Sequence, residues 1–439
     1  MRHRFLLVPG ALLLLALAPI PFLGDLRDRM TLFLLLWAAA HAAYLVAARH
    51  AASVAAPKGT RNGTGVPLVL AIGLLARVCV MPADPSLSED VYRYLWDGRL
   101  VAQGVNPFPH APADPALGRF HGDLSHRLNH AEVRTIYPPA AQLLFGVTAR
   151  VAPTPGAWKF VLLALELALV IGLLELLRGR GLPPRRLLLY YWNPLVIVET
   201  YGSGHLDLAA AAFLVLAIAL IEARRAFPAG IAFALAVLTK WVAVLLAPWL
   251  LRRRAWLLLA AAAGTAAILF APFWEAGSSL WTGLITYARH WEFNGALYRV
   301  LQSLGIADGA TRKLLAAGLV AATLGIAVRV RTAPGAAFAT MTAFLVLSPT
   351  VFPWYAVPAV AFLPLYADAG LLVFSGLLAL SYVPLPLYRA TGLWALPDWI
   401  LWVEYGGLAL AWGIAAWARS RRRASQERAV AWSSESTPT

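Results

Sequence analysis

Apolar residues occupy this chain in long runs of roughly 17–25 residues, separated by short polar segments. Lysine and arginine residues cluster in many of these segments, as in the cytoplasmic loops of helical membrane proteins. The clusters lie at Arg2 and Arg4, Lys58 and Arg61, 178–186, Arg224 and Arg225, 252–254, Arg329 and Arg331, and 419–423. When every cluster is placed in the cytoplasm, the pattern predicts about fourteen membrane-crossing segments, with both termini inside.

The predicted segments are 5–23, 31–48, 66–81, 158–178, 186–201, 206–224, 228–240, 241–251, 255–273, 311–331, 335–350, 354–367, 370–386 and 399–418. The first has no small-residue cleavage site and is expected to be a signal anchor. Segments 228–240 and 241–251 are short, which predicts a re-entrant or broken hairpin with Lys240 near its outer tip. The pattern thus predicts an all-α polytopic membrane protein whose residues 1–424 form one membrane domain of about 12–14 helices.

This topology leaves two long polar loops on the outer face, 81–157 and 275–309. In the first loop, Ser88 can cap a helix that ends before Gly104. The pair Pro138-Pro139 predicts a second helix, running to about Val151, because proline suits a first helical turn. We expect both helices to lie along the membrane surface. The polar tail, 425–439, is predicted to be disordered and cytoplasmic.

The composition also agrees with a membrane protein, and it argues against several kinds of partner and site. Of the 439 residues, 60% are hydrophobic and only 13% are charged, whereas soluble domains carry about 25% charged residues. The net charge is +15, but the basic residues sit in short loops and form no aromatic-lined groove, so no nucleic-acid partner is expected. Cys79 is the single cysteine, which excludes an intrachain disulfide framework and a cysteine-based metal site.

The acids Glu89 and Asp90 stand at the start of the first outer helix, beside several aromatic residues. Either carboxylate could act as a general base towards a hydroxyl acceptor, or as one half of a divalent-cation site. The competing interpretation is helix capping, because acids in a first turn interact favourably with the helix dipole. At helical spacing, Asp90 shares a face with Arg93 and Asp97.

A second polar group interrupts the apolar pattern in NPLVIVETYGSGHLD, residues 193–207. Glu199, His205 and Asp207 fall at or near membrane depth, where ionisable groups are costly and indicate function. His205 and Asp207 could instead simply cap the next helix. Lys240 is likewise isolated in an apolar setting and suits a lipid phosphate or a buried carboxylate, with snorkelling to the interface as the alternative.

The second outer loop and a later turn add further candidates. Arg289, His290, Glu292 and Asn294 form a polar cluster within TYARHWEFNG. The segment SPTVFPWY places Trp354 and Tyr355 in an aromatic turn. Aromatic residues gather at every bilayer interface, so this turn is a weak signal by itself.

Seven segments occur in a fixed order along the chain: SEDVYRYLWDG, GVNPF, TIYPP, NP…GSGHLD, TK, HWEFNG and SPTVFPWY. As an ordered set they resemble the bacterial GT-C glycosyltransferases that use polyprenyl-phosphate sugars, especially the polyprenol-phosphate-mannose-dependent mannosyltransferases. The resemblance implies a multi-helix fold in the bacterial inner membrane. It also implies an active site on the periplasmic side, with Asp90 or Glu89 as the catalytic acid.

The resemblance also implies the partners and the reaction. A single hexose, most simply mannose, would move from a polyprenyl-phosphate donor to a hydroxyl of a lipid-linked or cell-envelope glycan, with inversion. Membrane lipid is a further partner; no cofactor is certain, and a divalent cation is compatible with the acidic pair. The substrate-binding residues expected on this basis and from the polar pattern are Arg93, Tyr137, His205, Asp207, Lys240, Arg289, His290, Asn294, Trp354 and Tyr355.

Two features leave alternatives open. The aromatic turn in this family often begins with His-Pro-Trp-Tyr, whereas Phe352 precedes Pro353 here, so a histidine contact with phosphate or acceptor is not expected at that position. A polytopic transporter or flippase would share the helices and the basic loops, although this chain shows no internal repeat. A polymerase of lipid-linked polysaccharide would share the donor.

Overall fold

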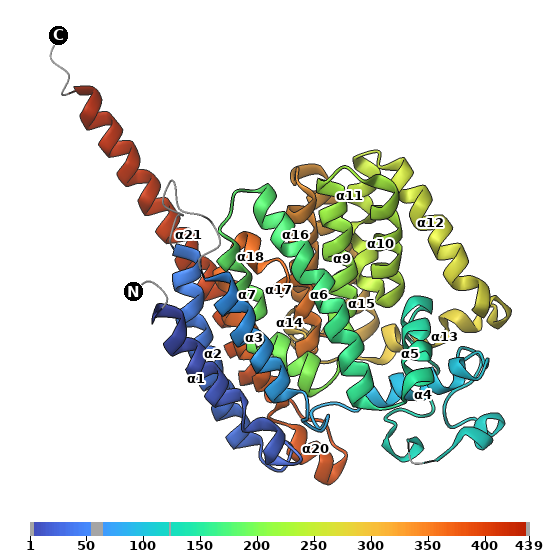
Figure 1. Ribbon diagram of the computed structural model, residues 1–439. Coiled ribbons are helices and arrows are strands. Elements are labelled where there is room, and N and C mark those ends of the chain that lie inside the picture. Colours follow the sequence, from blue (N-terminus) through green and yellow to red (C-terminus); the bar gives the residue numbers. More distant parts are fainter. Residues whose placement is uncertain (1–3, 54–64, 123, 436–439) are drawn as a thin grey trace.

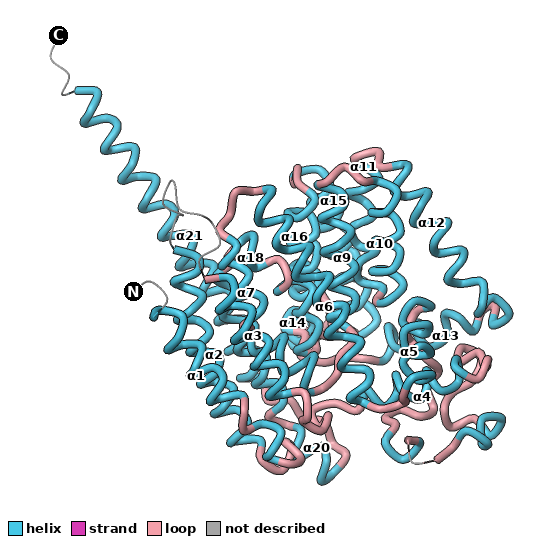
Figure 2. The backbone as a smooth tube through the Cα atoms, viewed as in Figure 1, coloured by secondary structure: helices cyan, strands magenta, loops and turns pink. Residues whose placement is uncertain are grey.

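The computed structural model describes residues 4–53, 65–122 and 124–435, and over these residues the chain forms a bundle of helices (Figures 1 and 2). Arg2, Lys58 and Arg61 of the predicted basic clusters lie outside the described residues. Within the described part, the only β-type pairing is a pair of isolated bridges that join Phe293 and Asn294 to Thr350. The predicted all-α class is therefore confirmed.

The helices of the first half are α1 Arg4–Leu17, α2 Met30–Ser53, α3 Val66–Val80, α4 Asp90–Ala102, α5 Pro139–Val151, α6 Pro155–Gly179, α7 Leu188–Tyr191, α8 Pro194–Ile197 and α9 Asp207–Glu222. Those of the second half are α10 Ala226–Thr239, α11 Ala247–Arg252, α12 Trp256–Phe270, α13 Ser279–His290, α14 Ala296–Ser303, α15 Asp308–Arg329, α16 Ala333–Leu347, α17 Val357–Val360, α18 Leu363–Tyr366, α19 Ala369–Leu377, α20 Leu385–Thr391 and α21 Asp398–Glu435. Short 3₁₀ helices lie between them: η1 Ile20–Leu23, η2 Pro115–Phe120, η3 Ser125–Arg127, η4 Pro184–Leu187, η6 Trp241–Leu246, η7 Ala271–Ala276, η8 Pro353–Ala356 and η9 Leu378–Tyr382. The element η5 Val198–Gly202 is a π-helical turn.

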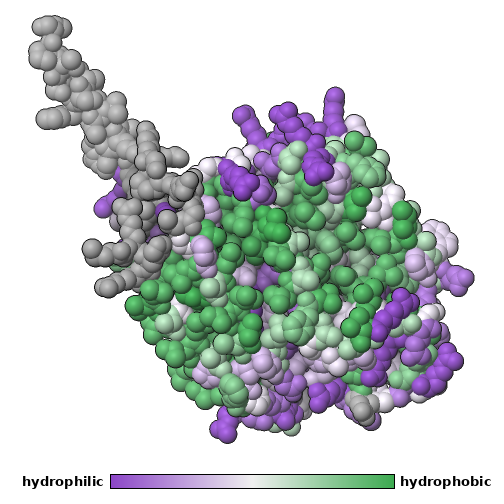
Figure 3. Space-filling model, viewed as in Figure 1, coloured by the Kyte–Doolittle hydropathy of each residue, from purple (hydrophilic) through white to green (hydrophobic). Residues whose placement is uncertain are grey.

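Several helices are long and apolar enough to cross a membrane. Among the described residues there are seven, with four shorter apolar helices beside them. The seven are Phe5–Leu23, Met30–Ala52, Pro155–Gly179, Trp256–Ala276, Asp308–Arg329, Ala369–Thr391 and Asp398–Arg421. Figure 3 shows hydrophobic residues in a broad band across the bundle and hydrophilic residues gathered towards its two ends. The chain is a polytopic membrane protein.

Two predicted crossing segments are not continuous helices. The segment 186–201 consists of η4, α7, α8 and most of η5, and 354–367 consists of η8, α17 and α18. Pro194, Pro358 and Pro364 lie inside these segments, and each lacks an N–H and clashes with the preceding turn, so a regular helix breaks there. These two predicted segments are therefore made of short helical pieces rather than of one continuous helix each.

Helix α21 continues to Glu435, through residues 425–435 that were expected to be disordered. This stretch contains no glycine or proline and is rich in good helix formers, which lets a helix already started in the membrane segment continue. Residues 436–439 lie outside the described part of the chain.

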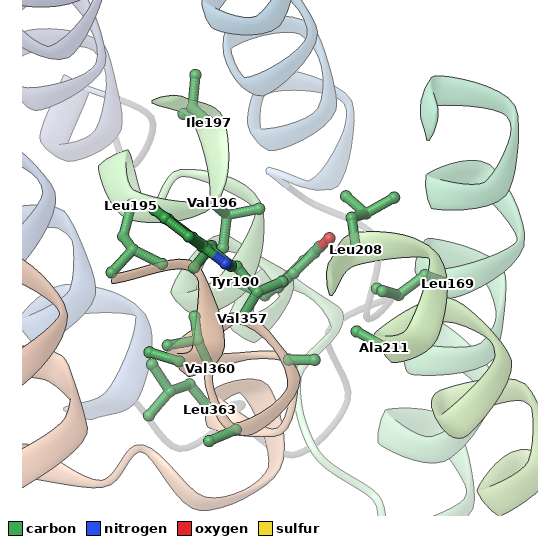
Figure 4. Packing of buried hydrophobic residues seen from close by; sticks show 14 of the residues in the cluster. Leu169, Tyr190, Leu195, Val196, Ile197, Leu208, Ala211, Val357, Val360 and Leu363 are labelled. Atoms are coloured by element: carbon green, nitrogen blue, oxygen red, sulfur yellow. The ribbon is translucent and has the colours of Figure 1, made fainter. Parts of the chain in front are cut away.

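The broken segments form the centre of the bundle rather than its edge. Figure 4 shows the packing of side chains from α6, α7, α8, α9, α17 and α18 around them. The labelled residues are Leu169, Tyr190, Leu195, Val196, Ile197, Leu208, Ala211, Val357, Val360 and Leu363, and all are buried. Tertiary packing therefore stabilises helical pieces too short to persist alone.

The outer-loop elements collect at one end of the bundle. In Figure 1, α4, α5, α13 and α20 lie towards the lower edge, whereas the connection between α11 and α12, which carries Arg252–Arg254, lies at the upper edge. Helices α4 and α5 begin and end within about two residues of their predicted bounds. They approach closely at Gly98, where an added Cβ would overlap the carbonyl oxygen of Phe145.

Candidate functional site

A cavity of about 920 Å³ opens at the end of the bundle that holds the outer-loop elements. Its walls come from the start of α4, the segment 129–138, the start of α9, the end of α13, the turn η6, and helices α15 and α16. Trp354, Tyr355 and Tyr382 are further lining residues. The cavity thus joins segments that are far apart in the sequence, including both predicted outer loops.

Asp90 is the first residue of α4 and lines this cavity. The hydroxyl of Ser88 accepts a hydrogen bond from the Asp90 backbone N–H at 3.2 Å, so Ser88 satisfies one N–H group of the first turn as predicted. Within the described residues, no group donates a hydrogen bond to the Asp90 carboxylate. That carboxylate is half-buried and free to accept a proton from a bound molecule.

Five tyrosine hydroxyls lie close enough to Asp90 to interact with it electrostatically. They are those of Tyr94, Tyr137, Tyr287, Tyr355 and Tyr382. Burial raises the pKa of Tyr137 well above its ordinary value, with the Asp90 charge acting in the same direction. The phenol is therefore neutral at physiological pH, and the surroundings of Asp90 are polar but largely uncharged.

Glu89 differs from Asp90 although the two are adjacent. It forms an ion pair with Arg27, which lies between η1 and α2. Arg27 also contacts Asp25, with 2.9 Å between Nη2 and Oδ2. Of the two acids that the sequence placed together, only Asp90 has an unpaired carboxylate at the cavity.

Lys240 lies at the break between α10 and η6 and also lines the cavity. Its Nζ is 2.5 Å from Oδ1 of Asp207 and 3.8 Å from the centre of the Tyr355 ring. The Tyr355 hydroxyl in turn lies 2.5 Å from that of Tyr287. The predicted broken hairpin is confirmed, and the anionic partner of Lys240 is the carboxylate of Asp207.

The turn before α9 determines where Asp207 points. Residues 198–202 form a π-helical turn, closed by a 2.9 Å bond from the Ser203 N–H to the Val198 carbonyl; such turns are frequent at functional sites. Gly204 then adopts φ +81°, a conformation that favours glycine. Its carbonyl accepts a hydrogen bond from the Trp158 indole at 2.7 Å, which fixes the turn. Asp207 follows as the first residue of α9.

His205 lies behind the cavity wall rather than in it. It is buried, and its ring stacks on Trp354 with 3.7 Å between ring centres. Its Nδ1 lies 3.1 Å from a carboxylate oxygen of Glu199. The other Glu199 oxygen accepts a hydrogen bond from the Tyr382 hydroxyl at 2.8 Å. His205 therefore supports Trp354, which lines the cavity.

Arg93 and Tyr137, two of the residues expected to bind substrate, line the cavity. The Arg93 guanidinium donates to Asp97 at 3.0 Å and to the Val133 carbonyl at 2.9 Å. Asp97 also accepts a hydrogen bond from Thr135 at 2.6 Å. These bonds hold the segment before α5 against α4.

The second outer loop separates into residues that reach the cavity and residues that do not. His290 lines it, whereas Arg289 is exposed and lies outside the lining. Asn294 is also outside the lining; it adopts φ +54° and donates a hydrogen bond to the buried Glu404 at 2.7 Å. Asn294 therefore connects this loop to α21, and its position does not favour direct contact with substrate.

Four lining residues were not singled out from the sequence: His130, Arg134, Tyr287 and Arg312. Glu292, a member of the predicted polar cluster in TYARHWEFNG, also lines the cavity. Burial raises its pKa, opposed by the charges of Arg299 and Arg312. As for metals, no group of three or more histidine, cysteine or acidic side chains suited to a metal ion occurs in the described part of the chain.

The described chain is thus an all-α membrane bundle with a cavity at the end that holds the outer-loop elements, and the carboxylates of Asp90 and Glu292 lie in its lining without an ion pair or a hydrogen bond. Residues 11–268 match the family described as alpha-(1->6)-mannopyranosyltransferase, N-terminal domain, and this span is more than half of the chain. The chain therefore belongs to that family, and the protein is a membrane mannosyltransferase. The matched span includes Asp90, Asp207 and Lys240. A comparison with curated protein sequences gives no match.

Proposed function

We propose that the protein is a GT-C-type enzyme that transfers one mannosyl residue from a polyprenyl-phosphate donor to a glycan hydroxyl, with inversion. The acceptor is a lipid-linked or cell-envelope glycan. The observation that carries this proposal is that one cavity contains both an unpaired carboxylate, Asp90, and a long apolar wall. A donor with a charged head and a hydrocarbon tail needs both.

The apolar wall is built by η6, α15 and α16, which pack against one another. Its lining residues include Val244, Leu245, Leu315, Leu319 and Leu347. Helix α15 is itself a candidate membrane span with much of its surface exposed, so a groove beside it can meet bilayer lipid. Burial of a polyprenyl chain there is favourable by about 0.8 kcal/mol for each CH₂ group removed from water.

In the proposed reaction, the acceptor oxygen attacks the anomeric carbon from the face opposite the phosphate. Asp90 takes the acceptor proton as the new C–O bond forms and the bond to the phosphate oxygen breaks. The phosphate leaves with the bonding electron pair, as polyprenyl phosphate. A single displacement of this kind turns a β-linked donor into an α-linked product, the anomer in the family's description.

The leaving phosphate gains negative charge, which a nearby cation stabilises. Lys240 is the candidate, because its Nζ is held by Asp207 and the Tyr355 ring inside the same cavity as Asp90. Arg289, the other candidate from the sequence, is not among the residues that line the cavity. The site is proposed to face the periplasm, with the termini in the cytoplasm, following the distribution of basic residues.

Membership of a mannosyltransferase family favours an enzyme over a transporter or flippase. A polymerase would use the same class of donor but add longer oligosaccharides. The length of the transferred unit distinguishes it from the proposed enzyme.

The test uses the full chain in lipid nanodiscs with polyprenyl-phosphate mannose and an oligomannoside acceptor. We expect free polyprenyl phosphate and an acceptor longer by one mannose, with polyprenyl-phosphate glucose as the matched control donor. An arm with a chelator tests for a divalent cation. Release of lipid phosphate without acceptor extension, or transfer of whole oligosaccharides, would overturn the proposal.

A further inference from the structure

A group of ion pairs lies beside the start of α4, outside the cavity lining except for Glu89. Its centre is the segment 25–28, between the first two helices of the chain. Arg27 pairs with Glu89 and with Asp25, and Asp25 and Asp28 each lie 2.9 Å from the Arg389 guanidinium of α20. The Leu26 N–H also donates to the Ser86 hydroxyl at 3.1 Å. This segment is thus fastened directly to the residues that precede α4.

The contact with Glu89 matters because Glu89 precedes Asp90 in the sequence. Negative charges on neighbouring residues disfavour each other, and a cation paired with one of them reduces this effect. Arg27 supplies that cation from outside the cavity. Burial works against ionisation of Asp25, yet the hydrogen bonds and charge of Arg27 hold the pKa of Asp25 below its ordinary value, so Asp25 is an anionic partner of Arg27.

We propose that Arg27 is a positioning residue for the transfer reaction: it neutralises Glu89 and fixes the first turn of α4, so that Asp90 alone serves as the base. The inference rests on the proposed function, in which Asp90 accepts the acceptor proton. It also explains how two adjacent acids come to have different roles. The sequence alone made them equivalent candidates.

Other charged groups face Asp90 and remain in place when Arg27 is changed. From α9 and the end of α10, Asp207 and Lys240 act on it with opposite signs and as a paired unit. The five surrounding tyrosines are neutral hydroxyl groups. A change in Asp90 ionisation on substitution of Arg27 would therefore report the charge of Glu89.

The decisive measurement is the pH dependence of kcat/KM in R27M, E89Q and the double variant R27M/E89Q. In R27M the charge of Glu89 is no longer compensated, so the acid limb of the pH profile of kcat/KM should move to higher pH. We expect a shift of about 0.5 to 1 pH unit, because the Arg27–Glu89 pair is partly exposed to solvent. The side chains of Arg27 and Glu89 are 22% and 34% exposed, so added salt should reduce the shift. The double variant should return the limb to its wild-type position.

Two controls separate electrostatics from structure. R389M removes the contacts to Asp25 and Asp28 but leaves the Arg27–Glu89 pair, and its acid limb should match the wild type. E89Q alone leaves the charge of Arg27 uncompensated, so the acid limb of this variant should move to lower pH. If R27M does not fold, the result for E89Q tests the proposal by itself.

The proposal is overturned if a folded R27M keeps the wild-type limb, if the shift persists in the double variant, or if the limb in E89Q does not move down. Full activity of D90N would be a different result, because it would remove the proposed function and not only the role of Arg27.

Discussion

The ammonium group of Lys240 lies 2.5 Å from the carboxylate of Asp207, at the break that ends α10. Neither residue has another charged partner within hydrogen-bond distance in the described part of the chain. Lys240 can therefore have two effects that variants must separate. One is to stabilise the turn before η6 through its pair with Asp207, and the other is to place a cation in the cavity.

Lys240→Met should destabilise the donor-free protein, because it leaves Asp207 buried without its partner. The Asp207 side chain is 2% exposed but that of Lys240 is 22% exposed, so we expect a loss below the 3–5 kcal/mol typical of a fully buried pair, at about 2 kcal/mol. K240M/D207N should recover much of this stability, measured by thermal unfolding in detergent. Donor binding should weaken by about 1.5–3 kcal/mol in both variants. Donor affinity unchanged in the stable double variant would mean that Lys240 is only structural.

Asp90→Asn should lower turnover by at least about 10²-fold, since it keeps the shape but removes the base. The unfolding temperature should change little, because the carboxylate has no hydrogen-bond donor in the described residues. Glu89→Gln is the matched control and should reduce turnover much less at the pH optimum. Equal losses in both variants would contradict the assignment of the base to Asp90.

Cysteine labelling tests the orientation in the membrane. In a Cys79→Ser background, a membrane-impermeant thiol reagent on whole cells should modify Ala113→Cys but not Gly181→Cys. Both positions are exposed, so a failure to react reports the membrane and not burial. The reverse labelling pattern would place Asp90 on the cytoplasmic side.

Glu292→Gln tests the effect of a half-buried acid on stability. Burial raises the pKa of Glu292 in the folded protein, so the folded state holds this proton more tightly than the unfolded state does. Stability from this group is present at low pH and is lost as pH rises through the folded pKa. The unfolding temperature of Glu292→Gln should therefore exceed that of wild type near pH 8, and the difference should vanish below the ordinary carboxyl pKa. A constant difference across that range would assign the effect to packing.

Gly98→Ala tests the close approach of helices α4 and α5. The new methyl group would overlap the backbone carbonyl of Phe145, and overpacking of this kind costs about 1–3 kcal/mol. Gly118→Ala is the matched control, because nothing lies within 4 Å of a Cβ added there. We expect a lower unfolding temperature for the first variant and a value close to wild type for the second.

The sequence predicted the elements whose formation depends on residues close together along the chain. Helix α5 begins at Pro139, one residue after the proline pair starts, because proline suits the first turn of a helix through its fixed φ. The break at Lys240 follows from two apolar runs that are each too short to cross a bilayer. The ordered motifs also identified the mannosyltransferase family, since those residues are read directly from the chain.

The roles of individual site residues depended on contacts between distant segments. Arg27 and Glu89 are 62 positions apart, Asp207 and Lys240 are 33 apart, and Asn294 and Glu404 are 110 apart. No local pattern encodes such pairs, because they form only when tertiary packing brings the helices together. That packing distinguished Asp90 from Glu89, placed His205 behind Trp354, and left Arg289 outside the cavity. It also stabilises 186–201 and 354–367 as broken helices. A helix that faces the bilayer would tolerate their prolines poorly, whereas the surrounding bundle can stabilise the breaks.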